Sequence, residues 1–541
     1  MTETISFIPS RVKNCAEGGH VAGARDIIDD GSGITLDELV GNKEYASADF
    51  SGMGRVVFKK NIVNGVNTLT QEMMSDANTI YVIQYDFTLG EDITVPENCV
   101  LEFEGGSISG AYTLIGNNTA IEAPLYKIFN DDVLFNGSYN VKTLYAVWFG
   151  LIPNNNQIEF GSKIQRIFNV ISSIYPKTHW STGHYFGGIL LKITAGKYWA
   201  TQEITIPDNL SGVTISGDTQ ESVIVINKVP EGNTLFKHTT LEGLWEWKIS
   251  NITFVSNNNR VFYLNCYYNS VIEDCSFYAG NNTIKLGLTC GTRIKRCSFV
   301  TSIDTCILID GSGYVGPDTT FFIEDCWAQH IGTFITLLNS KGSEVHILNT
   351  TIEYSDRAFI FNYVFNATFT NCYFEGNTNN STIYASNVKM TGCYFASSKK
   401  VEIKADGGAS TFICELPIKT DSLAIGDFGD ATNKVMKLYF GNDAFIDYNA
   451  KEALYKRRRI TGTYVIGYGY LYEVEYIDST NGKYFKGLIK RSGSQWSMQE
   501  KYSGNVQPST ANNAIYFGES DDYDESVSLH VKMIPDYLSE S

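Results

Sequence analysis

The sequence lacks the features that mark several large classes of protein. It has no run of about 18 apolar residues, the length that a membrane-spanning helix requires. The N-terminus, MTETISFIPSRVKNCAEGG, has no basic stretch followed by an apolar one, so we expect no secretory signal peptide. Charged residues make up only 19% of the chain, and 59 acidic against 42 basic residues give a net charge of −17. We therefore expect neither membrane insertion nor nucleic-acid binding, which needs a basic face.

Motifs for catalysis and metal binding are also missing. The chain has no nucleophile elbow, no P-loop, no HExxH and no cluster of His with metal-ligand spacing. The 11 Cys are odd in number and form no CxxC pair, and several lie inside apolar strand patterns. These features predict reduced, buried thiols in a protein made in a cytosol, and they speak against a zinc site. We expect no metal and no cofactor.

What the sequence does contain favours β-structure. Aromatic residues make up 13% of the chain, with 33 Tyr, and 48 Gly supply turns. A short pattern also recurs: IEDCSF begins at Ile272, IKRCSF at Ile294 and IEDCWA at Ile323. Successive copies follow at spacings of 21 to 29 residues, a period that is typical of a solenoid. The residues at the cysteine position are Cys275, Cys297, Cys326, Thr350, Cys372 and Cys393.

The columns of this repeat show its geometry. The position three before the Cys is always apolar, as in Ile272, and the second position after it is apolar too, as in Phe277. The position directly before the Cys is rich in Asp, Asn and Gly, which tolerate left-handed backbone, so we predict a corner there. The Cys then faces inward, where a small apolar side chain fits a fixed volume. An earlier copy, ISNITF, begins at Ile249.

A third apolar segment lies between successive copies, as in CILID at Cys306 and AFIFN at Ala358. Three short strands in each turn of about 22 residues predict an all-β fold, a parallel β-helix whose turns stack about 4.8 Å apart. These residues resemble the pectate-lyase-like right-handed β-helix family, including the tailspikes and tail fibres of phages. The polar corner is similar to the Asn ladder of that family. The resemblance covers roughly residues 185–400 and implies right-handed coiling and a homotrimer.

The flanking segments divide the rest of the chain. We predict an N-terminal attachment segment (residues 1–60), a β-rich unit that is a small solenoid or a β-sandwich (61–150) and a linker with an amphipathic helix that caps the coil (151–184). The β-helix follows (185–415), and the alternating strands and the Asn481–Gly482 turn predict a C-terminal antiparallel β-domain (416–541). The stretch WFGLIPNNNQIEF keeps only the Phe-Gly of the motif that precedes the helix in tailspikes. The basic run at Lys456 is interpreted as a solvated edge, or alternatively as a basic ligand site.

One group of side chains suggests chemistry. Glu353 and Glu375 stand one repeat apart, three residues after the cysteine position, so we expect them on adjacent turns about 5 Å apart. That is the separation of the two carboxyl groups in a retaining glycosidase. Trp327, Tyr373 and Tyr394 share the neighbouring outward column, where aromatic rings would stack on sugars. The alternative is that these outward side chains are solvated surface.

Other acidic residues are weaker candidates. Asp304, Asp310 and Asp356 flank the third strand of their turns, whereas Asp274 and Asp325 are corner residues with a structural role. Three hypotheses remain open. The first is a virion tailspike or tail fibre that binds a bacterial surface polysaccharide and joins other tail proteins through its N-terminal region. The second is a polysaccharide hydrolase or lyase on the same fold, and the third is a purely structural virion component.

Overall fold

The computed structural model divides the chain into two compact units, Met1–Arg55 and Val56–Ser541, and the description below concerns the second. Strand β1 (Gly54–Val57) spans their boundary. The structure describes residues 53–175, 185–208, 210–241, 243–302, 304–311, 320–338, 344–396, 401–403, 410–416, 434–440, 444–447, 452–455, 459–461, 471–492, 495–511, 514–517 and 526–534. Most of the predicted attachment segment and residues 456–458 of the basic run therefore lie outside the described residues.

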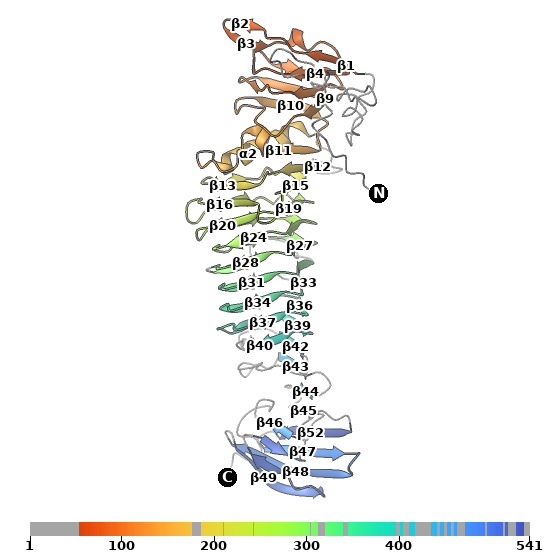
Figure 1. Ribbon diagram of the computed structural model, residues 1–541. Coiled ribbons are helices and arrows are strands. Elements are labelled where there is room, and N and C mark those ends of the chain that lie inside the picture. The colour runs from red at the N-terminus through yellow and green to blue at the C-terminus, as the bar shows by residue number, and fades with distance from the viewer. Residues whose placement is uncertain are drawn as a thin grey trace, which may run out of the picture. The chain divides into compact units, whose positions relative to one another are not determined.

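Three parallel sheets form the coil, and each turn of the chain adds one strand to each sheet (Figure 1). Sheet G runs through β11 (Thr143–Tyr145), β12 (Tyr185–Lys192), β15 (Leu210–Ser216), β19 (Lys248–Ser250), β23 (Val271–Glu273), β27 (Thr292–Lys295), β30 (Phe321–Glu324), β33 (Glu344–Leu348), β36 (Asn366–Thr370), β39 (Asn387–Thr391) and β42 (Ser410–Leu416). Sheet H runs through β13 (Gly196–Ala200), β16 (Val223–Asn227), β20 (Thr253–Ser256), β24 (Ser276–Tyr278), β28 (Ser298–Val300), β31 (Trp327–Gln329), β34 (Thr351–Glu353), β37 (Tyr373–Glu375) and β40 (Tyr394–Ala396). Sheet I runs through β14 (Ile204–Thr205), β17 (Thr234–His238), β21 (Arg260–Leu264), β25 (Ile284–Leu286), β29 (Thr305–Asp310), β32 (Thr333–Leu338), β35 (Arg357–Asn362), β38 (Ser381–Tyr384) and β41 (Val401–Ile403). A small sheet of β18 (Leu244–Trp245), β22 (Tyr267–Tyr268) and β26 (Thr289–Cys290) adds a fourth side to three turns.

The strand register confirms the predicted columns. Ile272, Ile294, Ile323, Ile347, Phe369 and Met390 are successive partners in sheet G. The corner residues that follow them have positive φ angles, from 49° at Asn349 to 65° at Gly392. The earlier copy fits as well, because Asn251 has a φ of 60°. All six side chains of the cysteine column are buried, with exposed fractions of 2% or less. The parallel β-helix is thus confirmed, and its right-handed coiling stays a prediction.

The N-terminal β-rich unit is a short solenoid and not a sandwich. Its strands pair in parallel along β4 (Thr79–Ile83), β7 (Val100–Phe103), β9 (Thr113–Glu122) and β10 (Leu134–Tyr139), with β6 (Ile93–Thr94) beside β9. A second ladder contains β2 (Ile62–Val63), β3 (Val66–Leu69), β5 (Phe87–Leu89) and β8 (Ile108–Ser109). Asn78, Asn98 and Asn118 repeat at intervals of 20 residues with φ angles of 50° to 58°. Each later Asn donates its amide to the one before, at 3.3 and 2.8 Å, so the polar corner recurs here as an amide ladder.

The capping helix α2 (Phe160–Ile174) lies where the sequence predicts it. It buries the expected apolar stripe of Ile164, Ile167, Phe168, Ile171 and Ile174. The Phe168 ring packs 5.6 Å from the ring of Trp247, so the helix covers the hydrophobic interior at the start of the coil. A short 3₁₀ helix, η4 (Ala146–Phe149), precedes it, and another, η3 (Gln71–Met73), lies in the N-terminal solenoid.

Strand β42 still pairs in parallel with the next strand of sheet G, and from that strand onward the ladder is antiparallel, as predicted for the C-terminal domain. It passes through β43 (Lys434–Phe440), β44 (Ala444–Asp447), β45 (Glu452–Tyr455), β52 (Val527–Ile534), β47 (Leu471–Asp478), β48 (Lys483–Ser492) and β49 (Gln495–Gly504). A separate small sheet contains β46 (Arg459–Thr461), β51 (Ala514–Tyr516) and β50 (Ser509–Ala511). The turn at Asn481–Gly482 joins β47 to β48, and Asp478 accepts a hydrogen bond from the Asn481 backbone N–H at 3.0 Å.

Candidate functional site

The predicted site residues lie together on the outward face of sheet H. Trp327, Thr351, Tyr373 and Tyr394 are successive partners on β31, β34, β37 and β40, visible as stacked strands in Figure 1. Glu353 and Glu375 are partners in the next outward column. The residues between the two columns point inward, and Ile352 and Phe374 are buried. Alternation along each short strand therefore places the aromatic rings and the two carboxylates side by side on one surface.

Glu375 is held by two tyrosines. The Tyr354 hydroxyl donates to one carboxylate oxygen at 2.6 Å, and the Tyr373 hydroxyl donates to the other at 2.9 Å. These hydrogen bonds lower the pKa of Glu375 below its ordinary value, because they favour the charged form. The hydrogen bond from Tyr354 has the larger effect and that from Tyr373 the smaller. The same contact with Glu375 raises the pKa of Tyr373 to about 12. At neutral pH the group is one carboxylate fixed by two neutral phenols.

Glu353 and the remaining rings extend this arrangement. The Trp327 indole N–H donates to Glu353 Oε2 at 3.4 Å, from the preceding turn. The rings of Tyr373 and Tyr394 stack with centroids 5.5 Å apart and planes 1° from parallel. Trp327 is 38% exposed and Tyr354 is 47% exposed, so both rings are accessible to a ligand.

We did not expect Tyr354 or its neighbour His330 from the sequence. Both occupy a second corner, between sheets H and I, with φ angles of 45° and 54°, and their rings stack 5.8 Å apart. The column reads Ala279, Thr301, His330, Tyr354 and Gly376, so it has no Asn or Gly pattern that would mark a corner. Extending the alignment of the repeat by one position would have shown that an aromatic ring follows Glu353. We call Trp327, Glu353, Tyr354, Tyr373, Glu375 and Tyr394 together the aromatic–carboxylate strip.

The strip contains no cation. Among the described residues, neither Glu353 nor Glu375 forms an ion pair, and their polar contacts are with the side chains of Trp327, Tyr354 and Tyr373. Within the same part of the chain, no group of three or more His, Cys, Asp and Glu side chains has the geometry to hold a metal ion. The strip can therefore accept hydrogen bonds and stack on flat apolar surfaces, and it has no group to neutralise an anionic ligand.

The weaker acidic candidates lie elsewhere. Asp310 is the last residue of β29, and Asp304 and Asp356 directly precede β29 and β35, so all three lie at the ends of sheet I strands. Asp310 lies 3.6 Å from Lys285 Nζ, and Asp356 accepts a hydrogen bond from the Thr378 hydroxyl at 3.3 Å. The corner carboxylates contact the neighbouring turn: Arg296 bridges to Asp274 at 2.6 Å, and Asn349 donates to Asp325 at 3.1 Å.

The fold and this surface define a parallel β-helix protein with an open aromatic and acidic face. No family model matches the sequence, and no curated protein matches it. Solved structures with a similar fold include ORF18 of Geobacillus virus E2, with a TM-score of 0.47 and 13% identity over 71% of this chain and 80% of that one. Another is Pantoea stewartii WceF, described as a glycan biofilm modifying enzyme with a tailspike-like parallel β-helix, with a TM-score of 0.43 and 13% identity over 72% of this chain and 59% of that one.

A third is the tailspike gp49 from Acinetobacter baumannii bacteriophage Fri1, a capsular polysaccharide depolymerase, with a TM-score of 0.31 and 12% identity over 74% of this chain and 87% of that one. Because these TM-scores lie below 0.5, the assignment of the fold rests on the strand register described above. No helix in the described ranges is both long and apolar enough to cross a membrane.

Proposed function

We propose that this chain is a tailspike or tail-fibre protein of a phage virion and that it binds a bacterial surface glycan through the aromatic–carboxylate strip. The observation that carries the proposal is the combination of exposed rings with a carboxylate fixed between them by Tyr354 and Tyr373. Aromatic rings stack on the apolar faces of sugars, and fixed acceptors bind their hydroxyl groups. The resemblance of the repeat to tailspike β-helices supplies the virion location, the attachment through the N-terminal region and the homotrimer.

The charge of the strip indicates which class of glycan it can bind. Two carboxylates without a cationic partner, on a chain of net charge −17, repel uronic or sialic acids. Neutral or amine-bearing sugars fit the same acceptors. Three identical sites in a trimer would raise the avidity for a repetitive polysaccharide without new contacts.

A binding experiment tests the proposal. Purified protein is applied to an array of bacterial surface polysaccharides with the variants Trp327→Ala and Tyr373→Ala, and Tyr112→Ala serves as a matched control, since Tyr112 is an exposed tyrosine of the N-terminal solenoid. We expect the two strip variants to lose roughly tenfold or more in affinity for neutral glycans and the control to lose none. A blank array would support the structural virion component instead. A gel-filtration mass near that of one chain, 60.2 kDa, would contradict the trimer.

A second function, depolymerisation, is favoured by the register of Glu353 with Glu375 on adjacent strands. The depressed pKa of Glu375 suits a nucleophile or a charge-stabilising carboxylate, so Glu353 would have to be the proton donor. Polysaccharides that the protein binds are incubated with it, and reducing ends and the ultraviolet absorbance of unsaturated products are followed. New reducing ends alone indicate a hydrolase, and both signals indicate a lyase. Glu353→Gln and Glu375→Gln should then abolish activity, while Gln329→Ala, in the same column, should not.

A further inference from the structure

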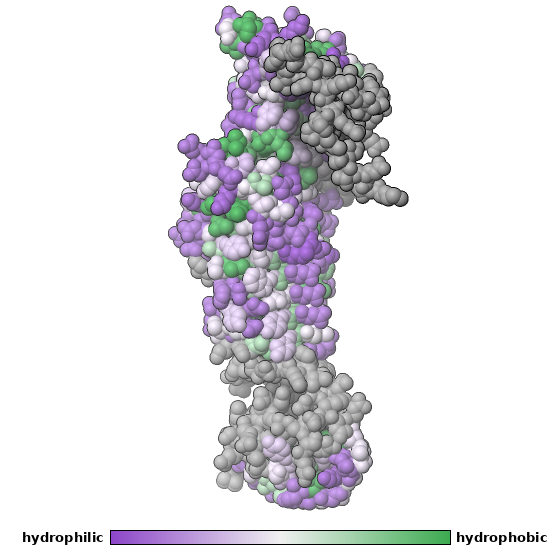
Figure 2. All heavy atoms as spheres, viewed as in Figure 1, coloured by the Kyte–Doolittle hydropathy of each residue, from purple (hydrophilic) through white to green (hydrophobic). Residues whose placement is uncertain are grey.

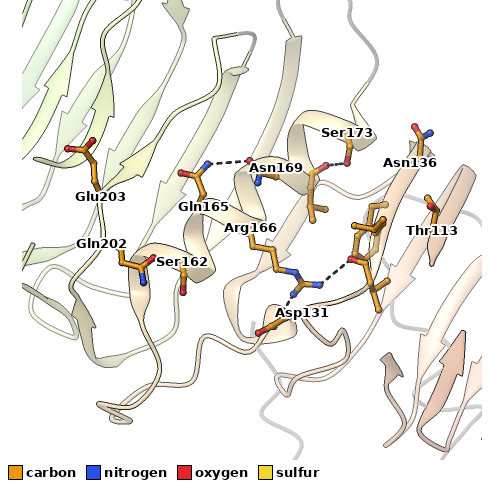
Figure 3. A pocket seen from close by; sticks show the side chains of 14 residues that line it. Thr113, Asp131, Asn136, Ser162, Gln165, Arg166, Asn169, Ser173, Gln202 and Glu203 are labelled. Atoms are coloured by element: carbon orange, nitrogen blue, oxygen red, sulfur yellow. Dashed lines mark hydrogen bonds and ion pairs between the residues drawn. The ribbon is translucent and has the colours of Figure 1, made fainter. Parts of the chain in front are cut away.

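A second surface, far along the chain from the strip, has the form of a binding site. A groove of about 810 Å³ lies between α2 and β10 (Figure 3). The face of α2 opposite its buried stripe carries Ser162, Gln165, Asn169 and Ser173, one helical turn apart along the groove. The other wall is formed by Val133 to Asn136, with Thr113 beyond it, and Gln202 and Glu203 line the end near the first coil.

The charged groups of the groove are paired with one another. Asp131 is contacted by Lys163 at 2.5 Å, Arg166 at 3.5 Å and Lys127 at 3.9 Å. Arg166 also donates to the Asn130 carbonyl and lies 5.3 Å from the centre of the Phe149 ring. At the far end, Lys237 pairs with Glu203 at 2.8 Å. Each charged side chain of the lining, Asp131, Arg166 and Glu203, therefore has an oppositely charged partner, and three cations share the Asp131 carboxylate.

What the groove does offer is amide groups and apolar surface. Gln165 is locked to Thr205 by two hydrogen bonds of 2.7 and 2.9 Å and donates to Asn169 Oδ1 at 3.2 Å. This contact uses the oxygen of Asn169 and leaves its amide N–H groups for a ligand. Asn136 is arranged in the same way, because its oxygen accepts from the Gly137 backbone at 2.8 Å. Figure 3 shows Asn136 and Asn169 on opposite walls.

The apolar part of the lining is Val133, Leu134, Phe135 and Val170. Leu134 is 57% exposed and Val133, Phe135 and Val170 are buried, so Leu134 is the exposed apolar side chain of the lining. The molecular face shown in Figure 2 is mostly hydrophilic, with small hydrophobic patches at the height of α2. Planar amides beside a modest apolar surface, with every charged lining residue in an ion pair, match a ligand with many hydroxyl groups and no net charge.

We propose that this groove binds an uncharged oligosaccharide, as a site separate from the aromatic–carboxylate strip. The test uses the full chain carrying Trp327→Ala and Tyr373→Ala, so that failure of the strip does not obscure the groove. Binding to an array of neutral and acidic oligosaccharides is measured for this strip-deficient protein alone and with one further substitution. The further substitution is Asn169→Arg, which fills the groove, or Asn169→Ala, which removes one amide. Asn117→Ala, at an exposed position of β9, is the matched control, and thermal unfolding checks that each variant is folded.

We expect neutral oligosaccharides to bind the strip-deficient protein, Asn169→Ala to weaken them roughly tenfold and Asn169→Arg to abolish them, with Asn117→Ala unchanged. Three results would overturn the proposal. The first would be that the strip-deficient protein binds no neutral glycan on the array. The second would be that Asn169→Arg leaves binding intact. The third would be that Asn169→Arg changes the oligomeric mass, which would make the groove a contact between chains.

Discussion

The Tyr354 hydroxyl donates a 2.6 Å hydrogen bond to Glu375, a residue of the following turn of the coil. Tyr354 sits in left-handed backbone with a φ of 45°, and the ring packs against Gly376, where an added Cβ would come within 2.8 Å of it. The corner conformation and Gly376 thus direct the Tyr354 hydroxyl toward the Glu375 carboxylate. Strand register alone would leave this carboxylate in solvent. A strained aromatic corner next to exposed rings is an arrangement that a purely structural turn does not require.

We predict that Tyr354→Phe raises the pKa of Glu375 toward its ordinary value, and that Tyr354→Phe with Tyr373→Phe raises it further. The reason is that each hydroxyl favours the carboxylate form. Because the folded pKa is depressed, the stabilisation is present above the unfolded pKa and is lost as pH falls through the folded pKa. The measurement is a ¹³C NMR titration of the glutamate carboxyls, with Glu375→Gln to assign the signal. An unchanged titration in the double variant would show that the hydrogen bonds do not set the pKa.

The first corner gives a prediction about backbone conformation. Gly392 has a φ of 65°, and a Cβ there would lie 2.5 Å from the Asn371 side-chain oxygen. We expect Gly392→Ala to destabilise the coil by about 1–2 kcal/mol, since a non-glycine residue is strained in left-handed backbone. Asn371→Gly, at a φ of 54° one turn earlier, should be nearly neutral. Chemical denaturation of the two variants checks both, and equal losses would argue against the conformational explanation.

The sequence predicted the coil well because its repeat is dictated by local physics. A small buried column, alternation of faces and a polar corner fix the register from Ile272 to Met390, and the structure has the same partners. The sequence did not predict the second corner because Thr301 and Tyr354 adopt positive φ angles that their residue types rarely show. Their conformation is imposed by the stacking of whole turns, which no single copy of the repeat reveals.

The candidate site was predictable in part for the same reason. Outward columns place Glu353 beside Glu375 and Tyr373 beside Tyr394 once the register is known. The hydrogen bonds that define the strip depend on side-chain directions at a corner, which spacing does not give. The groove between α2 and β10 depends on how the helix packs against the N-terminal solenoid, so the periodicity of the helix alone did not predict it.

The cysteine column gives a prediction about buried side chains. Thr350 occupies this column in one turn, and its hydroxyl donates to the Leu348 carbonyl at 2.9 Å. In the next turn back, Cys326 Sγ lies 3.4 Å from the matching carbonyl of Glu324. Cys326→Thr should therefore cost little, because the hydroxyl finds the same partner, whereas Cys326→Ala should cost about 1 kcal/mol for the lost volume. Equilibrium unfolding in urea measures both, and a larger cost for Thr than for Ala would contradict the argument.

The same burial predicts how the thiols react. Burial raises the pKa values of Cys297, Cys326 and Cys414 well above the ordinary value, which suppresses the reactive thiolate. Among the ten described cysteines, Cys290 alone is partly exposed. Cys15 lies outside the described residues, so the experiment uses the Cys15→Ser variant. We expect a thiol reagent to modify Cys290 of the native protein at a measurable rate and the other cysteines only after unfolding. Cys290→Ser should remove the native reaction, and modification of further thiols in the folded protein would contradict the buried column.

The N-cap of α2 anchors the capping helix to the coil. Glu159 accepts hydrogen bonds from the backbone N–H groups of Gly161 and Ser162 in the helix, and from those of Thr201 and Gln202 at 2.8 and 3.2 Å in the loop after β13. One carboxylate therefore satisfies donors of both elements and carries negative charge at the positive end of the helix.

We expect Glu159→Ala to destabilise the protein by about 2 kcal/mol, and Glu159→Gln by less, because the amide keeps one acceptor oxygen. Lys163→Ala is the control, since it removes the ion pair of the same helix with Asp131 without removing any hydrogen bond of the Glu159 side chain. Denaturation monitored by tryptophan fluorescence includes this region, because Trp247, one of the seven tryptophans, packs on Phe168 of α2. An equal loss in the lysine variant would mean that the cap adds nothing beyond surface electrostatics.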